Sequence, residues 1–282
     1  KLAMVNAFKE DGEVVAMLGD GVNDAPALKA SHIGVAMGQK GTEIAKAAAS
    51  LVITNDDLDK LIIGIASGRR IYSNIKKAIQ YIISIHIPIV LTVSLPLFLG
   101  WIYPHIFTPV HVIFLELIMG PTCSIVYENE PMEKGTMQQK PRKMTDTFLN
   151  WKELSISIVQ GLIITAGVLV TYQYAIYKGG NEENTRAMVF STLIFANIFL
   201  SLVNRSFIYS IFETLKYKNK LFPIIISATL LMLFMILYIP PFANFFHLES
   251  LTWSELLMTI LFAILSVFWF EIYKWFKRKR MS

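Results

Sequence analysis

Two carboxylates on a short glycine-containing segment are well suited to binding a divalent cation. Asp20 and Asp24 lie in the stretch GDGVNDAP, together with the amide of Asn23. Carboxylate oxygens are hard ligands that suit Mg²⁺, and the adjacent Gly19 and Gly21 permit backbone conformations closed to other residues. Ordinary turns use Asp, Asn and Gly for their local geometry as well. The segment is therefore a candidate magnesium loop.

A second set of polar side chains lies within long apolar stretches. Polar groups are costly inside a membrane, so they are candidates for function there. Pro88 and Pro121 would each free a carbonyl within a helix, as transporters do near ion sites. The alternatives are a glutamate wetted at a helix end and a histidine bonded to a main-chain carbonyl. The set consists of Ser84, His86, Glu116, Ser191, Thr192 and Asn197.

Short apolar runs surround the candidate magnesium loop. The runs at 13–18, 32–37 and 50–54 predict strands, and the intervening stretches and residues 1–9 predict helices. Strands that alternate with helices indicate a parallel α/β sheet, here too small to be a whole domain. Because the loop follows the first strand, it should lie at the carboxyl end of that strand, where such sheets place ligands.

The remaining sequence has the composition of a membrane protein. Of the 282 residues, 54% are hydrophobic and the mean hydropathy is +0.50, too apolar for an ordinary globular surface. A spanning helix needs about 20 mostly apolar residues. Six such stretches in succession disfavour the alternative of buried helices in a large soluble protein. The predicted spans are 79–100, 106–127, 154–177, 187–204, 221–239 and 253–273.

The net charge of +5 is clustered in the connections between predicted spans. Connections on the opposite side contain only Lys178 and Arg186 as basic residues. Positive connections stay in the cytoplasm, so both ends of the membrane region should face it. Clusters beside apolar runs argue against nucleic-acid binding, and the single Cys123 excludes an internal disulfide. The basic connections lie at 69–77, 134–143, 205–220 and 274–280.

The stretch MLGDGVNDAPALKASHIGVAMG, followed by GTEIAKAAASLVI, closely resembles the end of the phosphorylation domain of P-type cation-transporting ATPases. These pumps are haloacid-dehalogenase-like phosphotransferases. The resemblance continues through SGRRIYSNIKKAIQYIIS, which is similar to the stalk that enters the fifth membrane helix. It implies the C-terminal part of an α/β phosphorylation domain at 1–70, a stalk at 71–78 and a six-helix membrane bundle at 79–282.

The resemblance also implies roles for the loop. Asp20 would hold Mg²⁺ beside the phosphorylated aspartate, with Asn23 and Asp24 arranging the phosphate and the surroundings of the metal. Lys1 matches the lysine that contacts the phosphoryl group. Phosphoryl transfer depends on positioning and charge neutralisation, which Mg²⁺ and a lysine supply. ATP would be bound mainly by parts of the pump outside this sequence. The glycines assigned to cofactor binding are Gly19 and Gly21.

The nucleophile of the family is an aspartate in a DKTGT motif, which does not occur here. The nucleotide-binding domain, the actuator domain and the first four membrane helices are also missing, and the first residue is Lys1. We therefore expect a piece of a pump that works with its N-terminal remainder in a bacterial inner membrane. By itself it should form no phosphoenzyme with ATP; labelled aspartyl phosphate on this chain would contradict that expectation.

The transported cation is less certain than the family. In calcium pumps the fifth helix supplies an asparagine and a glutamate, where this sequence has His86 and Ile89. The sixth supplies an asparagine and an aspartate, where Glu116 and Gly120 stand. The stretch is more similar to a bacterial calcium/sodium-type branch reading roughly LELxxDPxCS, from which Gly120 departs. One carboxylate with a nearby histidine suits a proton or a weakly held cation better than caged Ca²⁺. Asn197 completes the candidate ion path.

Two other interpretations stay open. A truncated, non-catalytic membrane protein could bind or regulate a partner, or a phosphatase-like module could be fused to an unrelated channel-like bundle. The continuous stalk argues against the second, because independent modules would show a flexible joint. A DKTGT motif encoded upstream in the same reading frame would favour a pump as the parent protein. A start codon beside Lys1 would favour a truncated remnant. Six spans and a lone cysteine disfavour heavy-metal pumps and leave the calcium/sodium-type and proton-type branches.

Overall fold

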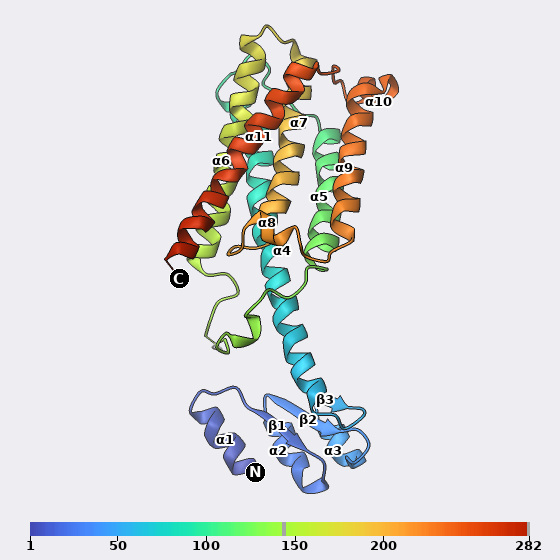
Figure 1. Cartoon of the computed structure of the whole chain (residues 1–282), viewed down its shortest axis with the longest axis vertical. Coiled ribbons are helices and arrows are strands. Elements are labelled where there is room, and N and C mark those ends of the chain that lie inside the picture. The colour runs from blue at the N-terminus through green and yellow to red at the C-terminus, as the bar shows by residue number, and fades with distance from the viewer. Residues whose placement is uncertain (143–144, 281–282) are drawn as a thin grey trace. The chain divides into compact units, whose positions relative to one another are not determined.

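The computed structural model describes residues 1–142 and 145–280, without the side chain of Cys123. It divides into two compact units (Figure 1). The first, here the α/β unit, comprises Lys1–Arg70 with Met132–Asp146. The second, here the helical unit, comprises Ile71–Pro131 with Thr147–Ser282. Lys143 of the predicted basic connection lies outside the described residues.

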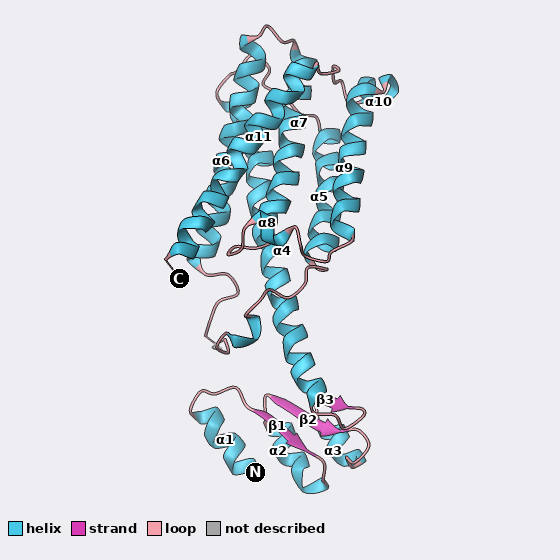
Figure 2. Cartoon of the chain, in the orientation of Figure 1, coloured by secondary structure: helices cyan, strands magenta, loops and turns pink. Residues whose placement is uncertain are grey.

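The α/β unit contains the predicted parallel sheet, drawn in magenta in Figure 2. Its strands are β1 (Ala16–Gly19), β2 (Ile33–Met37) and β3 (Leu51–Ile53), in the order β1-β2-β3. β1 starts at Ala16 rather than at residue 13, because its pairing with β2 begins where Ala16 meets Ile33. The helices are α1 (Leu2–Glu10), the 3₁₀ turn η1 (Val22–Asp24), α2 (Ala25–Ala30), α3 (Glu43–Ala48) and the 3₁₀ turn η3 (Thr136–Gln138).

Helix α2 packs closely on β2. Leu28, Ala36 and Ala45 form a small buried core. A Cβ atom at Gly34 would lie only 2.5 Å from the main-chain oxygen of Leu28. A side chain at this point would therefore push α2 off the sheet, and the helix would no longer present its first turn beside the end of β1.

The helical unit contains the predicted membrane bundle. Among the described residues, six helices are long and apolar enough to cross a membrane, as the sequence predicts. One of them, α4, is a single 40-residue helix that contributes to both units and includes residues 71–78. The six are α4 (Asp59–Phe98), α5 (Pro109–Pro121) with the π-helical η2 (Thr122–Tyr127), α6 (Trp151–Tyr177), α7 (Glu182–Val203), α9 (Leu221–Tyr238) and α11 (Trp253–Lys279). Two short helices are α8 (Ile211–Thr214) and α10 (Pro240–Phe245).

Three of the spans begin at side-chain caps. Asn150 accepts a hydrogen bond from the N–H of Glu153 at 2.8 Å, and the Glu153 carboxylate accepts one from the N–H of Asn150 at 3.0 Å. Thr252 and Glu255 form the same reciprocal pair at the start of α11, and Asn181 caps α7. Each cap satisfies donors that the first turn of a helix leaves unpaired. These spans therefore start where the sequence supplies a cap.

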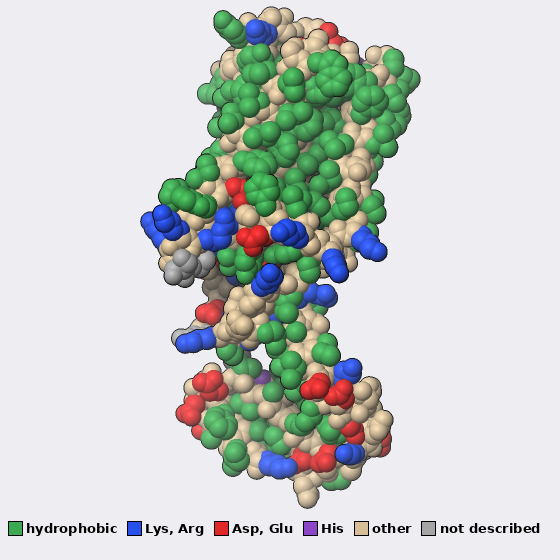
Figure 3. Space-filling view, in the orientation of Figure 1, with side chains coloured by type: hydrophobic (Ala, Val, Ile, Leu, Met, Phe, Trp, Pro, Cys, Tyr) green, Lys and Arg blue, Asp and Glu red, His purple; other side chains and the backbone are tan. Residues whose placement is uncertain are grey.

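Helix α7 is the central helix of the bundle, packed against α6, α9 and α11. Its most apolar 18-residue window is 89% buried, compared with 28% for α9 and for α11. Hydrophobic side chains cover the visible face of the helical unit, and Lys and Arg gather near the C-terminal end of α11 (Figure 3). Because apolar residues lie outside as well as inside, the chain is a multi-pass integral membrane protein.

Candidate functional site

The candidate magnesium loop leaves the carboxyl end of β1 and enters α2 through η1. Asp24, 5% exposed, accepts a hydrogen bond on Oδ1 from Lys1 Nζ at 2.7 Å. Its Oδ2 lies 3.4 Å from the N–H of Asp20, and its own N–H donates to the oxygen of Gly21 at 3.1 Å. Pro26 lies in the first turn of α2, where its missing N–H costs nothing. The buried carboxylate thus fixes both the lysine and the loop.

Charge on Lys1 and charge on Asp24 stabilise each other. The hydrogen bond to Asp24 raises the pKa of the Lys1 ammonium, and the negative charges of Asp24 and Asp20 act in the same direction. The hydrogen bond from Lys1 lowers the pKa of Asp24, against the opposing effect of burial. Because the Lys1 side chain is 61% exposed, this pair stabilises the fold only modestly.

Asp20 and Asn23 have exposed side chains on the same loop. The main-chain oxygen of Asp20 accepts a hydrogen bond from the N–H of Thr42 at 2.8 Å, which anchors the loop without using the carboxylate. Mg²⁺ is commonly held by one or two carboxylates together with phosphate oxygens and water. An exposed Asp20 beside a lysine-bound Asp24 fits that requirement. Among the described residues, no group of three or more His, Cys, Asp or Glu could enclose a metal ion.

The two loop glycines do not adopt the special backbone conformations that the sequence predicts for them. Gly21 has φ −103° and ψ 164°, a conformation open to any residue, and a Cβ there would meet nothing within 4 Å. Gly19 likewise lacks a positive φ, but a Cβ on it would lie 2.6 Å from Asp24 Cβ. The predicted conformational reason is therefore wrong for both glycines. Gly19 makes room for the buried carboxylate of Asp24.

Replacing Gly19 by alanine should therefore displace Asp24 and weaken its bond to Lys1, while Gly21→Ala should be tolerated. We expect Gly19→Ala to lower the free energy of unfolding by about 1–3 kcal/mol, as overpacking does. Gly21→Ala should change it by less than about 1 kcal/mol. Thermal unfolding of the two variants provides the comparison, and equal stability of the two would contradict the crowding at residue 19.

The pH dependence of the Lys1–Asp24 pair follows from the two pKa shifts. Asp24 has a pKa below the ordinary 3.8, so its contribution is complete above 3.8 and is lost as the pH falls through the lowered value. Lys1 has a pKa above 10.5, so its contribution is lost only as the pH rises through the raised value. We expect the stability difference between wild type and Asp24→Asn to be constant near neutral pH and to shrink below pH 3.8. Thermal melts of both proteins across the acid range measure it; a difference that grows toward low pH would contradict the shift.

Two ion-path candidates contact each other across α4 and α5. His86 Nε2 lies 3.0 Å from Glu116 Oε1, and His86 Nδ1 lies 2.8 Å from the oxygen of Ile82. Both side chains are nearly half exposed on the helical unit. A proton on Nδ1 satisfies the Ile82 carbonyl, which leaves Nε2 facing the carboxylate. The contact thus places an imidazole nitrogen of α4 within hydrogen-bonding distance of a carboxylate oxygen of α5.

The other two ion-path candidates, Gly120 and Asn197, form no side-chain hydrogen bond with His86 or Glu116 in the described part of the chain. Gly120 follows Glu116 by one turn on α5, and a Cβ on it would meet nothing within 4 Å. Asn197, on α7, is 3% exposed, and its Oδ1 accepts a hydrogen bond from the Tyr81 hydroxyl. Its Nδ2 is buried without a hydrogen-bond partner among the described residues. Asn197 is thus a polar group in the bundle with an unused donor.

Some polar residues of the bundle are explained by local bonds, and others were missed in the sequence. Ser191 donates to the oxygen of Ala187 on its own helix, at 2.7 Å. Gln160 and Asn204 exchange two hydrogen bonds, of 2.9 and 3.1 Å, and Gln160 also accepts one from Ser84 at 3.1 Å. The criterion that selected Ser84, a polar residue in an apolar stretch, selects Gln160 as well.

An α/β unit with a carboxylate loop at the end of a parallel strand precedes a bundle of membrane helices with polar groups inside. This combination defines a membrane protein of the P-type ion-pump class. The family described as "Cation transporting ATPase, C-terminus" matches residues 104–276, and the family of haloacid dehalogenase-like hydrolases matches residues 2–62. The chain belongs to the cation-transporting ATPase family.

Similar proteins are named as calcium-transporting ATPases. Calcium-transporting ATPase type 2C member 1 of Pongo abelii is 30% identical over 92% of this chain and 28% of its own length. Calcium-transporting ATPase 1 of Yarrowia lipolytica is 30% identical over 100% of this chain and 30% of its own length. Calcium-transporting ATPase 1 of Bacillus cereus is 31% identical over 99% of this chain and 33% of its own length. The chain thus spans a third or less of the length of these relatives.

Proposed function

We propose that this chain is the C-terminal part of an ATP-driven cation pump that works through a phosphorylated aspartate. It would supply the magnesium loop and the last six membrane helices, and the N-terminal remainder of the pump would supply the nucleophile and the ATP site. The observation that carries the proposal is the geometry of the loop at the carboxyl end of β1, where the Asp24 carboxylate binds the Lys1 ammonium and the main-chain N–H of Asp20, whose own carboxylate is exposed. The family match and the relatives support it.

Each loop residue has a separate task in this proposal. Asp20 would hold Mg²⁺ through its exposed carboxylate, and the bound ion would supply positive charge for the phosphoryl oxygens. Asp24 is a positioning residue, since it holds the Lys1 ammonium by one oxygen and the Asp20 main chain by the other. Lys1 then presents its partly exposed ammonium to the phosphoryl group. Asn23, exposed on the same loop, would orient the phosphate.

The transported ion would pass the His86–Glu116 pair and Asn197. The pair supplies one carboxylate and one imidazole, and the residue one turn beyond Glu116 is Gly120, which adds no second carboxylate. A proton or a weakly held cation suits this set of groups better than a Ca²⁺ ion enclosed by several carboxylates. Calcium is a candidate because the relatives are named as calcium-transporting. The basic connections favour a cytoplasmic position for both ends of the membrane region, and the similarity of the sixth-helix stretch to a bacterial branch favours a bacterial inner membrane.

The test is vanadate-sensitive ATP hydrolysis by the full-length pump that contains this chain, screened with Ca²⁺, Na⁺, Mn²⁺ and changes in pH. Stimulation by one cation, with acid-stable phosphate on the protein, is the expected result. Phosphate incorporation that no cation changes would contradict a pump, and absence of any phosphoenzyme would favour a non-catalytic membrane protein.

A further inference from the structure

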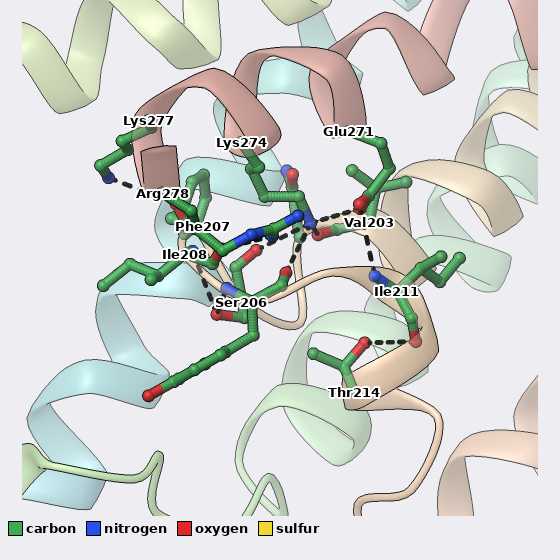
Figure 4. A network of polar contacts seen from close by, with 12 residues as sticks. Val203, Ser206, Phe207, Ile208, Ile211, Thr214, Glu271, Lys274, Lys277 and Arg278 are labelled. Atoms are coloured by element: carbon green, nitrogen blue, oxygen red, sulfur yellow. Dashed lines mark hydrogen bonds and ion pairs between the residues drawn. The ribbon is translucent and has the colours of Figure 1, made fainter. Parts of the chain in front are cut away.

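The end of α11 holds the connection between α7 and α8. The ammonium of Lys274 donates hydrogen bonds to three main-chain oxygens, those of Val203 at 3.0 Å, Ser206 at 3.2 Å and Tyr209 at 3.0 Å. It also pairs with the carboxylate of Glu271, one turn earlier on α11. Figure 4 shows these groups converging on the ammonium. Lys274 is fully buried, so its charge is balanced by groups of the protein, among them these oxygens and the ring of Phe270, whose centroid is 5.8 Å from the ammonium.

Two further basic side chains of α11 bind the connection between α7 and α8. Lys277 donates to the oxygen of Phe207 at 3.2 Å, and Arg278 donates to that of Ile208 at 2.8 Å. The four consecutive carbonyls of residues 206–209 therefore all accept from basic side chains of α11. Glu271 accepts a further hydrogen bond from the N–H of Ile211 at 3.3 Å. The main chain of the connection is thus bound by the basic end of α11, while its Ser206 hydroxyl accepts hydrogen bonds from the N–H groups of Ile208 and Tyr209.

Three carbonyl oxygens and one carboxylate around a single point charge form the donor set of a cation site. Carbonyl oxygens replace the hydration shell of a monovalent cation in this way. Val203 is the last residue of α7, where unpaired carbonyls and the helix dipole attract positive charge. Distances of 3.0–3.2 Å suit an ammonium or a large monovalent ion, because Ca²⁺ and Mg²⁺ need oxygens at about 2.0–2.6 Å. One carboxylate balances one positive charge.

We infer that the α7–α8 connection, with Glu271, is a monovalent-cation site whose cation is supplied by the chain itself as Lys274. When the lysine side chain is shortened, an ammonium or potassium ion takes its place. The site orders the residues between its ligands, and one of them is Arg205, which is buried against Glu130 with Nε 2.9 Å from Oε1. The cation therefore also fixes the segment that follows η2, because Glu130 lies just after the end of that helix at Tyr127.

The experiment uses the full chain purified in detergent, with ionic strength held constant by choline chloride. Lys274→Ala removes the ammonium and leaves room for an ion. Its Tm in choline should be lower than that of wild type by about 5 °C or more, because Glu271 and the carbonyls lose their buried partner. Replacing choline by ammonium or potassium chloride should restore at least half of that loss, since an ion that binds only the folded state stabilises it.

Two variants serve as matched controls. Lys274→Met removes the same charge but fills the space with an apolar side chain, so it should lose Tm and gain nothing from ammonium or potassium. Lys277→Ala removes a neighbouring lysine whose ammonium donates to the oxygen of Phe207, and the Tm of this variant should not depend on the cation. An equal response of Lys274→Ala and Lys274→Met, or a Lys274→Ala protein as stable in choline as wild type, would overturn the inference.

If Lys274→Ala cannot be purified in choline, recovery of folded protein becomes the measurement. Monodisperse protein obtained in ammonium or potassium but not in choline supports the cation site. Equal failure in all three salts counts against it, because the site would then need the lysine stem rather than a cation. Magnesium chloride at the same ionic strength should not replace either monovalent salt.

Discussion

Asp20→Asn in the full-length pump is expected to reduce Mg²⁺-dependent ATP hydrolysis by about 10³-fold or more. The variant keeps the size of the side chain and the main-chain bond to Thr42, and it removes only the exposed charge. Metal charge at the transferred phosphate is worth several kcal/mol in the transition state, and each 1.4 kcal/mol is a factor of ten. Hydrolysis measured across a Mg²⁺ titration should show both a lower rate and a need for more Mg²⁺.

Asp11→Asn is the matched control, because Asp11 is an exposed aspartate at the end of α1 in the same unit. It should hydrolyse ATP at the wild-type rate. Thermal melts of both variants separate loss of chemistry from loss of fold. If Asp20→Asn kept its activity at low Mg²⁺, the loop would not be the metal site, and an ordinary turn would explain its composition.

Glu116→Gln is expected to raise the cation concentration for half-maximal ATPase stimulation by about 10- to 100-fold. The amide keeps the size of the side chain and removes the negative charge that faces His86 Nε2 and an entering ion. A charged hydrogen-bonding partner is worth about 1.5–3 kcal/mol, which corresponds to that range. Cation titrations of the wild type and the variant measure the effect.

Ser94→Ala is the control for Glu116→Gln. Ser94 is a polar residue of α4 whose hydroxyl donates at 2.7 Å to the oxygen of Val90 on its own helix. Its removal should leave stimulation unchanged. Gly120→Asp tests the same site in the opposite direction, because a Cβ at this position would meet nothing within 4 Å and the residue lies one turn from Glu116. Stronger Ca²⁺ stimulation in Gly120→Asp is expected, and undiminished stimulation in Glu116→Gln would remove that residue from the ion path.

The sequence predicted the fold well where a local pattern dictates it. Short apolar runs identified β1, β2 and β3, and long ones identified the membrane helices, because both depend on burial of neighbouring residues along the chain. The start of α4 at Asp59 could not be predicted from apolar length. Residues 59–78 mix charged and glycine residues with isoleucines, so they form a helix without forming an apolar run. Element bounds thus depended on pairing and capping more than on hydropathy.

The candidate sites divide in the same way. Asp20 and Asp24 are close in sequence, so their joint position on one loop followed from the motif. Contacts between side chains of different helices could not be predicted from the motif, because they depend on which helix faces pack together. The sequence suggested a histidine near Glu116, whereas the contact of Asn197 with Tyr81 was unforeseen. Lys274 was counted only as a positive charge at a helix end, since sequence alone does not reveal that its ammonium is buried.

The burial of α7 has a consequence for how such sequences can diverge. A helix enclosed on nearly all sides has no surface where one apolar residue can replace another at no cost, so a change in α7 needs a compensating change in α6, α9 or α11. The outward face of α9 carries exposed residues such as Ile224, Leu231 and Phe234, which can exchange freely among aliphatic and aromatic types. Related proteins should therefore vary little in the sequence of α7 and more in that of α9. An alignment of such proteins would show the lowest variability in the central helix of the bundle.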